Sequence, residues 1–171
     1  MIRTMEITDL PRVAEIHVFG WRSAYRGIIS DEYLFNKMLV SRRMSSFESA
    51  VKNNTEESYV YDDGMIKAFM TIGDCRDEDK PGAFELWGIY VEPFMKRQGI
   101  GSILMDYCER IAIERGFSEI CLWVLEDNTE GRSFYEKLGY VPDGAKKRID
   151  FLSVTEMRYT KKLSGFFEDV V

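Results

Sequence analysis

One segment dominates the sequence: Ile89-Tyr90-Val91-Glu92-Pro93-Phe94-Met95-Lys96-Arg97-Gln98-Gly99-Ile100-Gly101-Ser102. Its pattern predicts a strand, then a basic glycine loop, then the first turn of a helix. In that order several backbone N–H groups converge on one place, and the positive end of the helix dipole adds to them. Glycine at 99 and 101 lets the backbone approach a ligand closely. The segment therefore predicts a site for a phosphate-bearing ligand.

Two common phosphate loops do not fit this segment. A Walker A loop needs Gly-Lys-Ser/Thr at its end, whereas Gly101 is followed by Ser102 and Ile103. A dinucleotide fingerprint needs a third glycine where Leu104 stands. An isolated Gly-x-Gly is also compatible with an ordinary surface turn. The context favours an anion site, because 83–91 is rich in aromatic and β-branched residues and 100–111 has the apolar periodicity of a helix.

The loop resembles that of the GCN5-related N-acetyltransferase (GNAT) superfamily, which carries Gln/Arg-x-x-Gly-x-Gly/Ala after its central strand. Here the motif runs from Lys96 to Gly101, with Lys96 where Gln or Arg is usual. A second segment, 128–140, is similar to the family's Asn-x-x-Ala-x-x-Phe-Tyr-x-Lys-x-Gly-Phe, with Gly131 at the alanine position. The resemblance covers residues 1 to about 163 as one domain and leaves 164–171 as a C-terminal tail.

The resemblance implies a mixed α/β (α+β) fold. In this GNAT fold a central, mostly antiparallel, twisted sheet has two parallel central strands that splay apart, and helices cover both faces. Periodicity and turn signals predict the order β-α-α-β-β-β-α-β-α-β-β, with Thr8-Asp9 as a cap for the first helix and the last two strands near 147–152 and 155–163.

The resemblance also implies acetyl-CoA as co-substrate. Backbone amides of the loop would hold its pyrophosphate, and the pantetheine arm would lie beside the central strand like an added strand. Asn128 would bond that arm, with capping of the following helix as the alternative. The expected cofactor-binding residues are Ile89, Tyr90, Val91, Lys96, Arg97, Gln98, Gly99, Ile100, Gly101, Ser102, Asn128, Ser133 and Tyr135.

Two residues are expected to carry the chemistry. Tyr135 matches the family's tyrosine and would protonate the departing CoA thiolate; core packing is the alternative. Glu85 is the candidate base, because strand alternation predicts it on the same face as Ile89; a surface ion pair with a lysine is the alternative. Gly88 either marks a β-bulge or makes room for a neighbouring side chain. Candidate walls of an acceptor pocket are Trp21, Tyr25, Trp87 and Phe151.

Composition narrows the class of protein. The chain has 171 residues, 45% of them hydrophobic, and a net charge of −6. This charge argues against nucleic acid as a partner. Without an apolar run of membrane length or a signal-peptide pattern, a cytoplasmic protein with no membrane partner is expected. Three scattered cysteines fit neither a zinc spacing nor a disulfide framework, so no metal is expected. His17, the single histidine, is expected in packing rather than catalysis.

The resemblance therefore implies an N-acetyltransferase that moves the acetyl group of acetyl-CoA to a primary amine of a small molecule, either polyamine or amino-acid-like, by direct attack. One alternative is acetylation of protein N-termini or lysines. Another is a catalytically silent CoA-binding regulator. Family members often dimerise, so a homodimer is a further expectation.

Overall fold

A computed structural model describes residues 1–164, so apart from Ser164 the expected C-terminal tail lies outside the described residues. Four α-helices and seven strands follow one another in the expected order. The strands are β1 (Ile2–Thr4), β2 (Glu57–Asp62), β3 (Ile66–Asp74), β4 (Phe84–Val91), β5 (Glu119–Leu125), β6 (Val141–Ile149) and β7 (Val154–Lys162). The α-helices are α1 (Leu10–Ala24), α2 (Val40–Asn53), α3 (Ile100–Glu114) and α4 (Thr129–Lys137).

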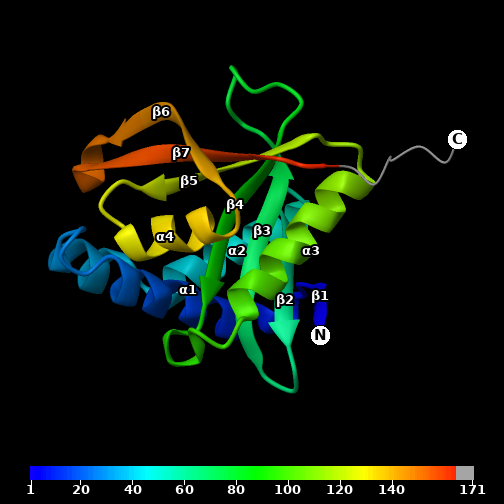
Figure 1. Cartoon of the computed structure of the whole chain (residues 1–171). Coiled ribbons are helices and arrows are strands. Elements are labelled where there is room, and N and C mark those ends of the chain that lie inside the picture. The colour runs from blue at the N-terminus through cyan, green and yellow to red at the C-terminus, as the bar shows by residue number, and fades with distance from the viewer. Residues whose placement is uncertain (165–171) are drawn as a thin grey trace, which may run out of the picture.

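All seven strands form one sheet in the order β1-β2-β3-β4-β5-β7-β6. Every neighbouring pair is antiparallel except β4 and β5, which are parallel. In Figure 1, α3 and α4 lie in front of this sheet while α1 and α2 lie behind it. The mixed α/β fold with helices on both faces, as the sequence predicted, is confirmed.

The parallel pair at the centre opens after three residues. Phe84, Glu85 and Leu86 of β4 pair with β5, and the register stops at Leu86↔Leu122. Beyond that point β4 still pairs with β3 and β5 still pairs with β7. The inner edges of β4 and β5 therefore face each other without pairing, which is the predicted splay.

A bulge beside this opening changes which face the β4 side chains occupy. Thr71 pairs with Gly88 and Ile72 with Leu86, so Trp87 is an extra residue in β4. Leu86 and Ile89 consequently belong to the same apolar core under α3. Gly88 also makes room for a side chain, since a Cβ there would lie 3.1 Å from Cε2 of Tyr90. Both interpretations of Gly88 therefore hold.

Two apolar cores hold the helices to the sheet. One packs α3 and Tyr135 of α4 against β3, β4 and β5. The other packs α1 and α2 against the opposite face, with Phe69 and Tyr90 as sheet contacts. His17 lies in this second layer, between Phe47, Phe69 and Tyr90, and burial lowers its pKa to about 2. The packing role expected for His17 is confirmed.

The predicted position of the sixth strand is wrong. β6 runs from Val141 to Ile149 and not over 147–152, where Asp150–Leu152 form a 3₁₀ turn instead. Pro142 and Gly144 are residue types that disfavour the interior of a strand. An edge strand tolerates both, because one side of it needs no hydrogen bonds and its register is irregular between Pro142 and Lys146.

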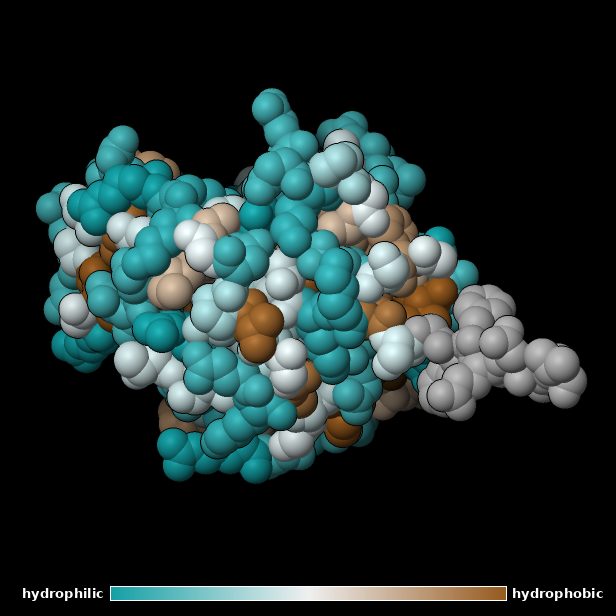
Figure 2. Space-filling view, turned by 45° about the horizontal axis from the view of Figure 1, so that its top comes forward, coloured by the Kyte–Doolittle hydropathy of each residue, from teal (hydrophilic) through white to brown (hydrophobic). Residues whose placement is uncertain are grey.

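Over residues 1–164, no helix is long and apolar enough to cross a membrane. On the face shown in Figure 2 the surface is largely hydrophilic, with apolar side chains in small separate patches.

Candidate active site

The glycine loop presents unused backbone donors. Pro93–Met95 form a 3₁₀ turn after β4, and α3 begins at Ile100. Between them Arg97 has φ 63° and Gly99 has φ 80°, both in the left-handed region. Within residues 1–164, the amides of residues 97–102 donate no hydrogen bond. A non-glycine residue held in this conformation is strained, which is common where a backbone cradle is built for a ligand.

Positive side chains surround these amides. Lys96, Arg97 and Lys137 line the adjoining cavity. Glu130 lines it too, and its carboxylate accepts a hydrogen bond from Nζ of Lys96 at 3.2 Å. With Lys137 on the same cavity, the three positive side chains outnumber the one carboxylate, which suits an anion at the N-terminus of α3.

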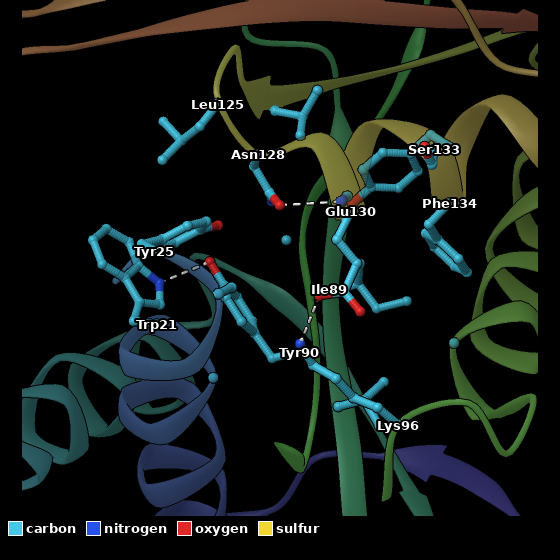
Figure 3. Close-up of a pocket in the computed structure, with 18 of the residues that line it drawn as sticks. Trp21, Tyr25, Ile89, Tyr90, Lys96, Leu125, Asn128, Glu130, Ser133 and Phe134 are labelled. Carbon is cyan, nitrogen blue, oxygen red and sulfur yellow. Dashed lines mark hydrogen bonds and ion pairs between the residues drawn. The ribbon is translucent and has the colours of Figure 1, made fainter. Parts of the chain in front are cut away.

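The cavity occupies the opening between β4 and β5 and has a volume of about 630 Å³. All the predicted cofactor-binding residues line it except Gln98. Gln98 is exposed, and its side-chain amide contacts Sδ of Met95 at 3.6 Å. Figure 3 shows Trp21 and Tyr25 at one end of the cavity, Lys96 and Phe134 at the other, and Asn128 between them.

Tyr135 reaches the cavity from α4 and is only 9% exposed. Burial raises the pKa of its phenol well above the ordinary value, so the hydroxyl keeps its proton at neutral pH. No hydrogen bond of this hydroxyl occurs within the described part of the chain. The group is thus available as a proton donor inside the cavity.

Asn128 has the capping role that the sequence offered as one alternative, and it also lines the cavity where the other alternative, a ligand contact, would occur. Its Oδ1 accepts a hydrogen bond from the Gly131 amide at 3.0 Å, which caps α4, and its side chain lines the cavity. Glycine at 131 makes this arrangement fit, because a Cβ there would lie 2.5 Å from Nδ2 of Asn128. The cap therefore uses the oxygen and leaves the amide N–H groups for a ligand.

The predicted face of Glu85 is wrong, because the extra residue Trp87 reverses the alternation between Glu85 and Ile89. Glu85 is 1% exposed and does not line the cavity. Its carboxylate instead accepts hydrogen bonds from the backbone and guanidinium of Arg76 at 2.5–3.2 Å. It also lies beside Cys75 and Cys121, whose sulfurs are 3.2 Å apart, a proximity that their sequence spacing did not suggest.

Trp21, Tyr25 and Trp87 line the cavity as expected of acceptor-pocket walls, whereas Phe151 is 76% exposed and lies outside it. Other lining residues escaped the sequence analysis: Trp123, Leu125, Glu130, Lys137 and Glu156. Trp123 and Leu125 share one face of a strand that was predicted correctly, so alternation could have indicated them. No local sequence pattern indicated Glu156, because only the pairing of β7 with β5 brings this residue to the cavity.

Comparison with known proteins agrees with this geometry. Residues 29–140 match the model of the Acetyltransferase (GNAT) family. An uncharacterised N-acetyltransferase of Bacillus subtilis, YuaI, is 30% identical over 130 residues, covering 74% of this chain and 72% of that protein. A spermidine N(1)-acetyltransferase of Thermoplasma acidophilum is 29% identical over 142 residues, covering 81% and 86%.

Among solved structures, the PaiA N-acetyltransferase of T. acidophilum in complex with coenzyme A has a TM-score of 0.76 at 23% identity, covering 95% of this chain and 98% of that one. The family match and the relatives identify the protein as an acyltransferase, and the cavity between splayed strands fits that class. The chain belongs to the GNAT acetyltransferase family.

Proposed function

We propose that this enzyme transfers the acetyl group of acetyl-CoA to a primary amine of a small molecule. The observation that carries the proposal is that Arg97 and residues 99–102, whose amides donate no hydrogen bond within residues 1–164, line one cavity together with Tyr135. A diphosphate held at the loop and a thioester near Tyr135 are the two ends of the same co-substrate.

Residues at successive positions along the cavity bind different parts of acetyl-CoA. The loop amides and the positive end of α3 bind the pyrophosphate, while Lys96 and Arg97 add charge. A methyl group at Gly101 would lie 3.1 Å from Cζ of Phe134, so glycine allows the loop and Phe134 to pack closely at this end of the cavity. The unpaired edge of β4 offers backbone groups to the pantetheine arm, as an added strand would use them.

The reacting groups meet deeper in the opening. A backbone N–H near Tyr90 or Val91 stabilises the oxyanion that forms when the amine attacks, a contribution of roughly 3 kcal/mol for a preorganised donor. The amine attacks in its neutral form. As the intermediate collapses, the C–S bond breaks and Tyr135 protonates the departing thiolate, while the proton that the nitrogen loses returns to the Tyr135 oxygen through water. Glu85 is not proposed as the base, because Arg76 holds its carboxylate outside the cavity.

The T. acidophilum relative is named as a spermidine acetyltransferase, and this favours a polyamine as the acceptor of the present enzyme over other amines. The test is release of free CoA thiol from acetyl-CoA across a panel of polyamines, amino acids and lysine-containing peptides, with acetyl-CoA binding measured by calorimetry. Turnover with a small amine supports the proposal. Turnover with peptides alone assigns a protein acetyltransferase, and binding without any turnover assigns a CoA-binding regulator. A cytoplasmic location and a homodimer stay predictions from the sequence.

A further inference from the structure

The charged residues that line the cavity are divided between its two ends. Lys96 and Arg97 belong to the glycine-loop end, where Lys96 also pairs with Glu130, and Lys137 lines the cavity from α4. Glu156 is the other lining carboxylate, and it belongs to the opposite end with Trp21 and Tyr25. One end is therefore suited to an anion and the other to a cation.

The sheet fixes the position of Glu156. It faces Leu125 across the β5–β7 pair and Lys147 across the β6–β7 pair, with its side chain 21% exposed. Its negative charge reaches the cavity hydroxyls. Burial is the main cause that raises the pKa of Tyr25 and of Tyr90, and the Glu156 carboxylate raises both further.

The surroundings of Glu156 already hold an ammonium group. Nζ of Lys147 lies 3.4 Å from the carboxylate and 4.0 Å from the centroid of the Trp123 ring. A carboxylate beside an aromatic wall binds alkylammonium through charge and cation–π contact. Lys147 is half-exposed, so an ammonium group of the acceptor can take its place beside the carboxylate.

We infer that Glu156 binds a second ammonium group of the acceptor, so that the enzyme selects amines with two separated positive charges over monoamines and amino acids. The inference rests on the proposed function and adds the acceptor class to it. The reacting amine would lie toward Tyr135 and β4, and the distant ammonium would lie between Glu156 and the walls formed by Trp21, Tyr25 and Trp123.

The test compares 1,4-diaminobutane with butylamine, which has the same chain length and a single charge. Wild-type enzyme is expected to prefer the diamine in kcat/KM by about tenfold or more, and Glu156→Gln to remove this preference through a higher KM for the diamine at similar kcat. Glu156→Asp keeps the charge and is expected to keep the preference. Glu48→Gln is the matched control, since Glu48 lies on α2, outside the cavity, paired with Lys52.

Binding separates this inference from the proposed function. Calorimetry of 1,4-diaminobutane with CoA-loaded protein needs no turnover, and Glu156→Gln is expected to weaken it about tenfold or more while butylamine binding stays unchanged. Equal use of diamine and monoamine by the wild type, an unaltered preference in Glu156→Gln, or failure of CoA-loaded protein to bind the diamine would overturn the inference. If the diamine binds in a way that depends on Glu156 but no acetyl group is transferred, the proposed reaction is wrong and the inference about Glu156 still holds.

Discussion

The Tyr135 hydroxyl is the group on which the proposed chemistry depends most directly, and Tyr135→Phe removes it with little change in shape. Turnover should fall by about a hundredfold or more, whereas affinity for acetyl-CoA should change little. Because burial raises the pKa of Tyr135, its proton is not lost as pH rises through neutrality, so this residue should add no alkaline limb to the pH–rate profile below about pH 10.

Thiol release and calorimetry measure the two effects. Tyr107→Phe is the matched control, because Tyr107 packs against Tyr59 from α3 and does not line the cavity. Equal turnover in wild type and Tyr135→Phe would exclude this phenol as the acid.

Asn128 allows capping and ligand binding to be measured separately. Asn128→Ala removes both the cap and the amide donor, so it should lower the free energy of unfolding by about 1 kcal/mol and weaken acetyl-CoA binding. Asn128→Ser keeps a hydroxyl that can cap α4 but lacks the amide N–H groups. It should therefore retain most of the stability and still bind acetyl-CoA more weakly. Urea unfolding and calorimetry give the two quantities, and wild-type affinity in Asn128→Ser would leave the cap as the only role.

At the scale of elements, the junction of β4, the loop and α3 is the part that the sequence predicted best. Its signals are local: β-branched residues, then two glycines, then a helical period. The prediction of side-chain facing failed where the pairing of β4 with a neighbouring strand decides which face a side chain occupies. The bulge at Trp87 depends on the register against β3, so alternation along β4 alone placed Glu85 on the wrong face.

The same junction supports a prediction about Gly101. In Gly101→Ala the new methyl group would crowd Phe134 and displace the loop backbone that forms the anion cradle, so the Kd for acetyl-CoA should rise about tenfold. Ile103→Ala is a control in the same helix, since Ile103 is 44% exposed and lies outside the cavity. Calorimetric Kd values that do not differ between these two variants would argue against the loop as the diphosphate site.

At the scale of the whole molecule, the sequence indicated most of one end of the cavity and little of the other. The glycine loop and the segment from Asn128 to Tyr135 are each continuous in sequence, so a motif could reveal them. The opposite end gathers Trp21 from α1, Trp123 from β5 and Glu156 from β7. Only the sheet order β5-β7-β6 brings the last two together, and no local pattern encodes that order.

Long-range ion pairs give a last prediction, about stability. Asp9 stands at the predicted cap position of α1, yet its carboxylate accepts hydrogen bonds from the Glu6 amide and from Arg3, at 2.7 and 2.9 Å, instead of capping the helix. Arg3 also pairs with Asp62 at 2.9 Å, so β1, α1 and the end of β2 are joined through one guanidinium. Arg3 is the main cause that holds the pKa of Asp9 below its ordinary value.

A carboxyl group whose pKa is lower in the folded state stabilises the fold above its unfolded pKa of about 3.9, and this stabilisation is lost as pH falls through the folded value. Asp9→Asn should therefore lower the free energy of unfolding at pH 7 by about 1 kcal/mol, a modest value because Arg3 is one-third exposed. The difference from wild type should shrink below about pH 4 and vanish once Asp9 itself is protonated. Urea unfolding at a series of pH values measures it, and a difference that stayed constant from pH 7 to pH 2 would show that the carboxylate charge contributes nothing to joining these elements.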